Sequence, residues 1–491
     1  MKVFWLMARS RQELIFAIRW QYIVRYLGQF CLIVGFLNLV PLGVALLHAE
    51  TAIALSYTGL VIGLFCLGGF SRTRTRGHMQ MNEAMVLAAA VFLLIPLLAA
   101  FPQIRAGTPF ADAWFETVSA VTTTGLSTLG DAASQPVTFL FARAWMQWYG
   151  GLGIVVLSVA MVVRPGMSAL RLASLDAPDD LVGGTRAHAQ RVLLVYLGLT
   201  GCGFLLWLLL GGSPFTGLLY ILAAVSTGGF APTSGSLADL TSLRLAWVVT
   251  LVALAGAIPL ALYHQTWQKG WRHFWQNMEL RTLLLVGILM TVLLGCFLRT
   301  QGMPMTEIFT HAPLMALSAQ TTTGFSSLDP GTLDAGSKMT LILAMAMGGG
   351  VGSTAGGFKL WRVLILLGVL YRCLKSFSVP PNAVVEQRLG HRRIEPNEVQ
   401  DALMIILMFI GVVFVSWMSF LVYGFDPLDA LFEVVSATGT VGLSSGVTKA
   451  SMPVFLKLVL CADMLLGRLE FVAWMVFFYH RTWFGRKRGE Q

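Results

Sequence analysis

Long runs of apolar residues divide this chain and restrict what it can fold into more than any other feature. Residues 86–100, VLAAAVFLLIPLLAA, contain no charged side chain, and similar runs recur along the whole sequence. A helix needs roughly 18 apolar residues to cross a bilayer. Only 12% of the 491 residues are charged, whereas soluble domains carry about 25%. The sequence therefore predicts an integral membrane protein.

One unit repeats four times after two N-terminal spans, which are predicted near residues 28–48 and 52–70. Each unit has a spanning helix, a short segment opened by Pro, a turn rich in Thr, Ser and Gly, and a second spanning helix. The first helices are predicted near 85–101, 192–211, 282–298 and 401–423, and the second near 138–163, 243–263, 338–371 and 453–479. The short segments cannot cross a bilayer, so each must enter and leave on one side.

The turn at the centre of each unit is polar although both of its flanks are apolar. The turns read SAVTTTGLST from Ser119, AAVSTGGFAP from Ala223, SAQTTTGFSS from Ser318 and SATGTVGLSS from Ser436. Non-helical backbone at membrane depth is tolerated only where it is buried in protein or lines a water-filled cavity. Four turns on one axis can present rings of carbonyl oxygens that replace the hydration shell of a cation. The predicted cation filter comprises Thr123, Thr124, Gly125, Thr227, Gly228, Gly229, Thr322, Thr323, Gly324, Thr440, Val441 and Gly442.

The repetition predicts the architecture of the whole chain. We expect an all-α integral membrane protein with four pseudo-symmetric helix–pore-helix–filter–helix repeats around a central pore, preceded by two extra spanning helices. Residues 1–84 hold an N-terminal interfacial helix, these two spans and a basic loop. Repeats 1 to 4 are placed at 85–191, 192–281, 282–400 and 401–491, and the second helix of repeat 3 is expected to be broken.

The charge distribution predicts the orientation. The net charge is +10, and most of the 34 Lys and Arg residues fall in segments that we place on the inner side, as the positive-inside rule requires. This pattern argues against nucleic-acid binding and predicts cytoplasmic N- and C-termini. Eleven carboxylates, among them Asp112, Glu116, Asp429 and Glu433, then lie outside with the turns, and an acidic mouth concentrates cations. The six cysteines lie mostly in apolar runs and are predicted to be buried free thiols.

Two features of the second helices break the usual rules for a membrane span. Within the helix expected from residue 338 onward the chain places Gly348, Gly349, Gly350, Gly352, Ser353, Thr354, Gly356 and Gly357, although each interior Gly costs about 1 kcal/mol relative to Ala. We interpret this stretch as an intramembrane loop, the alternative being a closely packed glycine-rich helix face. Arg468 lies near the middle of the last predicted span, where a charge costs about 3 kcal/mol. It either lines the pore near the loop or forms a buried ion pair that orients helices.

These segments resemble the Trk/Ktr/HKT superfamily of potassium transport proteins and, within it, the bacterial TrkH-type membrane subunits. TTTG, STGGF, TTTGF and TVGLS resemble the four filter segments of that family, and WMQWYGGLGIVVL from Trp145 and LLGRLEFVAW from Leu465 resemble its second helices. The resemblance implies channel-like K⁺ uptake across the bacterial inner membrane, one pore per chain, a homodimer, and a cytoplasmic nucleotide-binding regulatory subunit resembling TrkA. It also implies that the glycine loop and Arg468 form the gate, and that NAD or ATP/ADP binds only to the regulatory partner.

Alternatives rest on the same residues. In some relatives with Ser at the first filter glycine the ion is sodium, so four glycines favour potassium, although ATGTVGL departs from the TTTG pattern. A K⁺/H⁺ or Na⁺-coupled symporter is the alternative, with Asp463 as its prominent carboxylate. An enzyme is disfavoured because we find neither a nucleophile–base cluster nor metal-binding spacing such as HExxH, and neither a covalent cofactor nor a metal besides K⁺ is expected. Glu116 and Glu433 either brace the filter or face the vestibule, and Lys457 is expected to snorkel outward.

Overall fold

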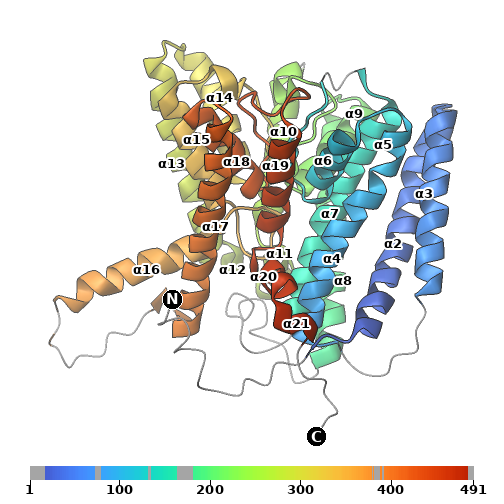
Figure 1. The fold of residues 1–491 in the computed structure, drawn as a ribbon. Helices are drawn as coiled ribbons and strands as arrows, with labels where there is room; N and C mark the ends of the chain where they lie inside the picture. The colour runs from blue at the N-terminus through green and yellow to red at the C-terminus, as the bar shows by residue number, and fades with distance from the viewer. Residues whose placement is uncertain are drawn as a thin grey trace, which may run out of the picture.

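The computed structural model describes residues 17–71, 79–130, 134–162, 181–240, 242–378, 380, 388–389 and 392–484. Almost every element in this part of the chain is an α-helix (Figure 1). The exceptions are two 3-10 helices, η4 (Ser236–Asp239) and η5 (Pro330–Thr332), and a small antiparallel hairpin of β1 (Arg388–Leu389) and β2 (Arg392–Arg393). The predicted all-α class is confirmed.

The helices follow the predicted order. Two helices that pack together precede the units, α2 (Trp20–Leu47) and α3 (Thr51–Phe70). The first helices are α4 (Met81–Ala99), α8 (Leu181–Leu209), α13 (Met278–Thr300) and α17 (Pro396–Val422), and the short helices are α6 (Phe110–Val121), α9 (Pro214–Val225), α14 (Met305–Gln320) and α18 (Pro427–Thr438). The second helices are α7 (Val137–Val162), α10 (Leu243–Ala257) with α11 (Leu260–Lys269), α15 (Ala335–Met347) with α16 (Leu360–Ser376), and α19 (Val454–Arg468) with α20 (Val472–Phe478). Three short helices complete the set: α5 (Phe101–Arg105), α12 (Trp271–Gln276) and α21 (His480–Phe484).

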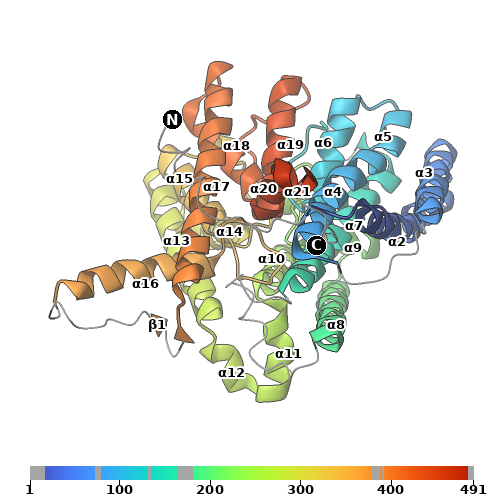
Figure 2. The same cartoon turned by 60° about the horizontal axis from the view of Figure 1, so that its bottom comes forward.

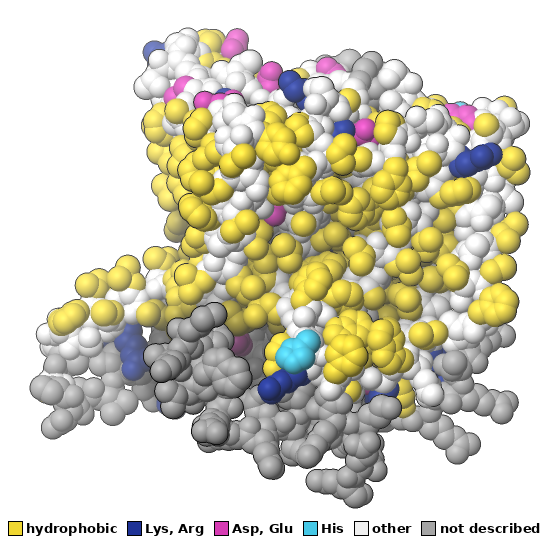
Figure 3. All heavy atoms as spheres, in the orientation of Figure 1, with side chains coloured by type: hydrophobic (Ala, Val, Ile, Leu, Met, Phe, Trp, Pro, Cys, Tyr) yellow, Lys and Arg dark blue, Asp and Glu magenta, His cyan; other side chains and the backbone are white. Residues whose placement is uncertain are grey.

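Several helices of the molecule are long and apolar. Among the described residues, 6 helices are long and apolar enough to cross a membrane, or 7 if α10 and α11 count as one span. They are α2, α3 and the first helix of every unit, with α4 extended by α5. On the face shown in Figure 3, hydrophobic side chains cover the middle of the molecule, and charged side chains gather near its upper and lower ends. The chain is therefore a multi-pass membrane protein.

The short helices form the interior. Phe115 of α6, Tyr220 of α9, Met315 of α14 and Phe432 of α18 are completely buried. Each short helix packs against the second helix of its own unit and also against the second helix of the preceding unit. The last such contact, between α19 and α6, joins the fourth unit to the first. The four units thus close into a ring that holds the turns after the short helices at its centre.

The second helices differ most from prediction, because three of them are broken. The expected break in the third unit lies between α15 and α16, and α16 extends sideways from the bundle (Figures 1 and 2). The continuous helices predicted near 243–263 and 453–479 are wrong. Helices α10 and α11 meet at a bend of 81°, where Pro259 lacks an N–H and disfavours helical backbone before it. Helices α19 and α20 are separated by residues 469–471, where Glu470 and Phe471 have φ of 53° and 64°.

Helix starts and thiol positions also differ from expectation. Each first helix begins earlier than predicted, and α8 differs most because it starts at Leu181 instead of near residue 192. All six cysteines are free, but only Cys31 and Cys461 are buried, so the prediction of buried thiols is wrong for the other four. An apolar position on a spanning helix can face lipid as well as the core, and sequence periodicity did not separate these two environments.

Candidate functional site

The four polar turns meet at the centre of the ring. A β-carbon added to Gly125 would lie 2.8 Å from the Cα of Gly229, and one added to Gly229 would lie 3.1 Å from the Cα of Gly324. A β-carbon on Gly324 would lie 3.0 Å from the Cα of Gly442, and one on Gly442 would lie 3.1 Å from the Cα of Gly125. The glycine of each turn therefore lies against the glycine of the next turn, and that of the fourth turn lies against that of the first. Real side chains do not tolerate such contacts, so the ring requires glycine at all four positions.

The residue two positions before each of these glycines has an unusual backbone conformation. Thr123, Thr227, Thr322 and Thr440 have φ of 57°, 50°, 55° and 52°, which β-branched L-residues rarely adopt. In each turn, the N–H of the residue after this threonine donates a hydrogen bond to the carbonyl five residues earlier, at 2.8 to 2.9 Å. The same bond closes a helix C-cap, where the residue with positive φ is usually Gly. Strain of this kind persists only where the surroundings enforce it. Sequence reasoning missed this feature, although the Thr at one register in all four turns was a signal for it.

Two buried glutamates hold the chain that follows the first and fourth turns. Glu116 accepts hydrogen bonds from the hydroxyl of Ser127 at 2.7 Å and from the N–H of Thr128 at 2.8 Å. Glu433 accepts five from residues 444–448, including one from the N–H of Ser445 at 3.0 Å. Both side chains are completely buried. Of the two alternatives considered for these residues, bracing describes their contacts and exposure to the vestibule does not.

The same register in the other two units holds neutral side chains. Tyr220 and Met315 stand nine residues before their glycines, as the two glutamates do. The Tyr220 hydroxyl donates to the carbonyl of Ser236 at 2.8 Å, and the Met315 sulfur accepts from the N–H of Ser327 at 3.2 Å. His311 packs beside this contact, with Nδ1 3.1 Å from the Ser327 hydroxyl. The residue nine positions before the glycine therefore braces the chain at all four turns, as a carboxylate, a phenol or a thioether.

Helix α7 links the first turn to the second. The Arg143 guanidinium lies 3.6 Å from the Glu116 carboxylate and 3.9 Å above the ring of Phe230, the residue after the second turn. Gln147, one helical turn further, accepts from the N–H of Phe230 at 3.2 Å. Its side chain also fills the space beside Gly228, where a β-carbon would lie 2.5 Å from Cδ. The second turn is thus held by side chains of the first unit.

Two ion pairs join neighbouring units. Lys338 on α15 lies 2.6 Å from Asp429 on α18, and Lys457 on α19 lies 2.5 Å from Asp112 on α6. The two aspartates share one register before their turns, and the second pair closes the ring between the fourth and first units. The expected outward snorkelling of Lys457 is wrong, because its ammonium is bound by Asp112 and by the carbonyl of Ala450 at 2.8 Å.

The expected acidic mouth is largely engaged in local hydrogen bonds. Glu50, Asp329, Asp334 and Asp426 each accept a hydrogen bond from a backbone N–H at 2.9 to 3.0 Å. Such bonds satisfy N–H groups that helices and turns leave without partners. These carboxylates therefore also hold the structure around the turns.

Residues 348–359 form the loop that the glycine-rich stretch predicts. No helix covers them, and Gly348, Gly352 and Gly357 have φ of 69°, 75° and 71°. A β-carbon on Gly349 would lie 2.6 Å from that of Ala355 and 3.0 Å from the carbonyl oxygen of Ala257, so the loop and its neighbours fill the space at this position. The alternative of a continuous glycine-rich helix face is therefore wrong.

The loop touches the turns directly. The N–H of Gly356 donates to Oγ1 of Thr322 in the third turn at 2.7 Å. The Gln320 side chain, just before that turn, donates to the carbonyl of Gly348 at 2.7 Å. The carbonyl of Gly439, beside the fourth turn, accepts a hydrogen bond from the N–H of Gly357 at 3.1 Å. The loop therefore packs directly against the third and fourth turns.

Thr354 connects this loop to three other helices. Its hydroxyl donates to the carbonyls of Val225, at the end of α9, and Gly256, near the end of α10, both at 3.0 Å. Its carbonyl accepts a hydrogen bond from Nη1 of Arg468 at 2.8 Å. Arg468 is the last residue of α19 and not the mid-helix residue that the sequence suggested.

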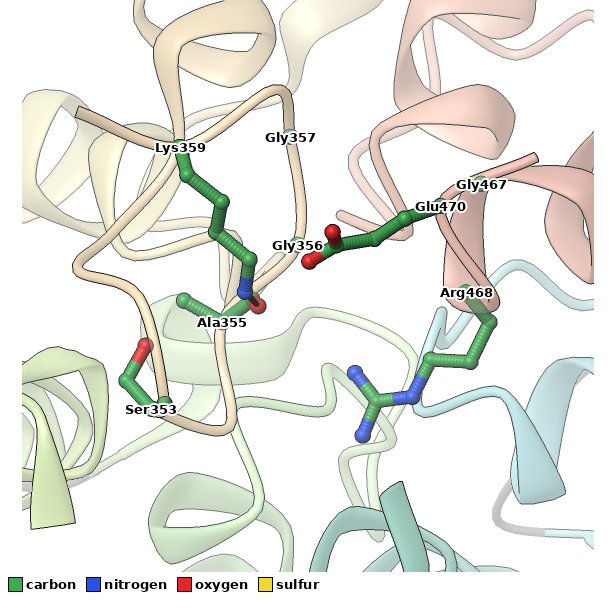
Figure 4. A pocket seen from close by; sticks show the side chains of 9 residues that line it. Ser353, Ala355, Gly356, Gly357, Lys359, Gly467, Arg468 and Glu470 are labelled. Carbon is green, nitrogen blue, oxygen red and sulfur yellow. Dashed lines mark hydrogen bonds between the residues drawn. The ribbon is translucent and has the colours of Figure 1, made fainter. Parts of the chain in front are cut away.

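Arg468 faces the loop across a small cavity that it lines with Ser353, Lys359 and Glu470 (Figure 4). Its side chain is buried, and its Nε and Nη2 atoms have no hydrogen-bond partner among the described residues. The ion pair considered as its alternative role is absent from this part of the chain, because neither Asp463 nor Glu470 forms a salt bridge with it there. The cavity thus contains a buried cation with unused hydrogen-bond donors.

Two more cations beside the cavity, Lys359 and Arg362, escaped sequence analysis. Lys359 donates to the carbonyl of Ala355 within the loop. Arg362, in the first turn of α16, forms an ion pair with Glu470, in the break between α19 and α20. This pair ties the end of the loop to the last unit. The two cations directly after the glycine-rich stretch, in FKLWR, were the signal that could have drawn attention to it.

The described residues contain no group of three or more His, Cys, Asp or Glu side chains that could hold a metal ion. Among the described residues, the carbonyls of Thr124, Thr323 and Val441 lie beside the glycine ring. Such a set can bind a weakly held monovalent cation by replacing its water, as rings of carbonyl oxygens do in ion filters.

The comparisons with known proteins point in one direction. The model of the TrkH family, described as "Cation transport protein", matches residues 59–483. The chain is 27% identical to an uncharacterised cation transporter from Methanocaldococcus jannaschii, over 93% of this chain and 94% of the relative. It is 28% identical to the Trk system potassium uptake protein TrkH of Vibrio parahaemolyticus, over 94% of this chain and 99% of the relative. In structure it resembles the crystal structure of the potassium transporter TrkH from Vibrio parahaemolyticus, with a TM-score of 0.85 over 95% of this chain and 100% of the other, at 23% identity.

Proposed function

Because the chain belongs to the TrkH family of cation transport proteins, we propose that it is a potassium uptake protein of the bacterial inner membrane. Relatives that are Trk system potassium uptake proteins support potassium as the ion. The observation that carries the proposal is the closed ring of Gly125, Gly229, Gly324 and Gly442. The proposal includes no catalytic activity and no cofactor bound to this chain, since ion permeation needs only replacement of the hydration shell.

The proposed filter uses the backbone carbonyls of three successive residues in each turn. It consists of Thr123, Thr124, Gly125, Thr227, Gly228, Gly229, Thr322, Thr323, Gly324, Thr440, Val441 and Gly442. The four short helices end at these turns, so their partly negative C-terminal ends favour a cation there. The strained threonines and the buried braces behind them keep the oxygens from relaxing around a smaller ion. K⁺ is cargo in this site and not a resident cofactor.

The proposed gate is the glycine loop together with Arg468. It includes Gly348, Gly349, Gly350, Gly352, Ser353, Thr354, Gly356 and Gly357. The loop packs against the third and fourth turns, and the Arg468 guanidinium adds a positive charge that opposes a passing cation. Conduction then requires the loop to move. This motion breaks the hydrogen bond from the Gly356 N–H to Thr322 and the one from Arg468 to the Thr354 carbonyl.

We further propose that the protein works as a homodimer with a cytoplasmic regulatory subunit resembling TrkA, and that NAD or ATP/ADP binds to that subunit. The inward-positive charge pattern supports cytoplasmic termini. The two ends of the described chain lie together, since the N–H of Ile18 donates to the carbonyl of Thr482 at 3.0 Å. One cytoplasmic partner could therefore contact the chain near Ile18 and near Thr482 together.

The test is ion-selective flux in vesicles that contain the purified full-length protein. We expect K⁺ and Rb⁺ uptake driven by membrane potential, with little Na⁺ uptake. Gly125→Ser should reduce both flux and selectivity, because the new β-carbon would lie 2.7 Å from the amide nitrogen of Gly229 at a φ of 92°. Gly130→Ser is the matched control, since nothing lies within 4 Å of its β-carbon position. Flux that Gly125→Ser leaves unchanged would refute the filter.

A second candidate, K⁺/H⁺ or Na⁺-coupled symport, is favoured by one observation. Asp463 is 1% exposed, its Oδ1 accepts from the Ser416 hydroxyl at 2.7 Å, and its Oδ2 has no hydrogen-bond partner among the described residues. A buried carboxylate without a cation favours its protonated form, as a proton carrier requires. Symport predicts a reversal potential that shifts with pH at constant K⁺ and no longer does so in Asp463→Asn. A reversal potential that follows K⁺ alone would exclude it.

A further inference from the structure

The bend of 81° after α10 directs α11 and α12 out of the helix bundle. Figure 2, in which the end of the molecule with α21 comes forward, shows α11 and α12 at its rim. Pro259 starts this hairpin, and Gly270 turns the chain between the two helices with a φ of 85°. The aromatic rings of Tyr263 and Phe274 pack across the hairpin, 5.9 Å apart. It is therefore a defined element and not a loose connection.

The outer surface of this hairpin combines exposed tryptophans with basic residues. Trp267, Trp271 and Trp275 are 91%, 74% and 56% exposed. Lys269 and Arg272 lie among them, and residues 260–278 contain no Asp or Glu. Tryptophan rings prefer the membrane–water interface, and Lys and Arg are attracted to anionic headgroups at the same depth. The pattern matches a membrane surface that bears negative charge.

Both ends of the hairpin are tied to the glycine loop. At its start, the N–H of Leu260 donates to the carbonyl of Gly352 at 3.2 Å. Just after its end, the buried carboxylate of Glu279 accepts from the N–H of Val351 at 3.3 Å. Gly350 lies between these ties, and a β-carbon on it would be 2.7 Å from Pro259 and 3.1 Å from Glu279. A displacement of the hairpin must therefore displace residues 350–352 of the loop.

We propose that α11 and α12 form a binding surface for anionic lipid headgroups, and that lipid seated there holds the glycine loop against the turns. The lipid site rests only on the hairpin, whereas its effect on transport also rests on the proposed function. Lys269 and Arg272 provide the charge together with Arg281 of α13, whose Nε donates to the carbonyl of Trp275 at 2.5 Å, and the tryptophans set the depth. Each basic residue near an anionic surface contributes about 1 kcal/mol, or roughly fivefold in affinity, so three together amount to about a hundredfold.

The binding test uses the full-length protein in detergent, titrated with phosphatidylglycerol or phosphatidylcholine and measured by native mass spectrometry. The test variant combines Lys269→Gln, Arg272→Gln and Arg281→Gln. The control combines Arg105→Gln, Arg244→Gln and Arg299→Gln, which removes the same charge from exposed positions elsewhere. We expect selective retention of phosphatidylglycerol by the wild type and the control, and its loss in the test variant. Equal retention by both variants would overturn the lipid site.

The coupling test measures Rb⁺ uptake into vesicles of phosphatidylcholine with and without one quarter phosphatidylglycerol. We expect the anionic lipid to slow wild-type uptake about fivefold, in the range of ordinary coupling between sites, and to have no effect on the test variant. Glu279→Ala should keep lipid retention but lose this dependence, because it cuts one tie to the loop. Dependence on the anionic lipid that persists in the test variant would overturn the coupling.

If the test variant keeps its lipid but loses its response to a cytoplasmic subunit, the surface binds protein and the lipid proposal fails. Absence of Rb⁺ flux in every lipid counts against the proposed function, while retention still decides the lipid site.

Discussion

The ion pair between Lys457 and Asp112 offers the most direct test of the ring. It joins residues 345 positions apart in sequence and connects the last unit to the first. Helix α6, which carries Asp112, ends at the first turn, so a loosened pair should also loosen that turn. The perturbation is Lys457→Met, which keeps an unbranched side chain one heavy atom shorter but leaves the Asp112 carboxylate without its cation.

The magnitude follows from burial. The Lys457 and Asp112 side chains are 4% and 12% exposed, and removing one partner of a buried pair costs about 3–5 kcal/mol. The equivalent pair, Lys338 with Asp429, is 9% and 27% exposed. Water can solvate Asp429 when its partner is removed, so Lys338→Met should cost less, between that range and the roughly 0.2–1 kcal/mol of exposed pairs.

The assay is reversible unfolding of the purified protein in detergent, arranged as a double-mutant cycle. Lys457→Met and Asp112→Leu alone should each lower the free energy of unfolding by about 3 kcal/mol or more, and together they should come within about 1 kcal/mol of the wild type. In vesicles, K⁺ over Na⁺ selectivity should fall in Lys457→Met and recover in the double variant. Strictly additive single losses would refute the pair, and a larger loss in Lys338→Met would refute the reasoning from burial.

Three further predictions concern the turns and the loop. Glu433→Gln should lower K⁺ over Na⁺ selectivity about tenfold, because an amide cannot accept all five hydrogen bonds from residues 444–448. A bi-ionic flux assay measures this selectivity, with Glu307→Gln at an exposed position as the control. Equal effects of the two substitutions would contradict the bracing role of Glu433. Thr322→Val should raise basal Rb⁺ flux several-fold because it removes the acceptor for the Gly356 N–H, whereas Thr123→Val should not, since the Thr123 hydroxyl has no hydrogen-bond partner among the described residues. Arg468→Gln should also raise basal flux, because it removes a buried charge and weakens the bond to Thr354; unchanged or lower single-channel conductance would argue against its place in the gate.

The repeated unit was predictable from sequence because the residues that begin and end its elements are local signals. Apolar runs mark the spans, Pro opens each short helix, and Thr and Gly mark each turn. The bend at Pro259 was also within reach, since the residue before Pro avoids helical backbone. The break after Arg468 was not, because LEFVAW contains neither Gly nor Pro. Tertiary contacts produce it, among them the ion pair of Glu470 with Arg362.

The convergence of the turns followed from their repetition, but the groups that hold them did not. The braces differ in chemistry at equivalent places, as Glu433 and Met315 illustrate, so no pattern of residue types reveals them. The partner of Lys457 is far away in sequence, and hydropathy alone suggested a side chain directed to water. Pairing and burial of polar groups depend on the assembled fold, and a single sequence specifies these less directly than it specifies helices.

The three broken helices share one explanation. A helix that breaks within the membrane leaves amide and carbonyl groups that must find partners inside the protein. The break after α10 is satisfied by the loop, through the bonds from Gly350 to Ala257 at 3.0 Å and from Leu260 to Gly352 at 3.2 Å. The break after α19 faces the same loop through Arg468, whose bond ends on the Thr354 carbonyl. The N–H groups of Glu470 and Phe471 donate to carbonyls at the end of α19, at 3.2 and 3.1 Å. The glycine loop thus contacts the ends of both α10 and α19. If the loop is the proposed gate, its motion therefore involves the second, third and fourth units, because residues of all three meet at the loop.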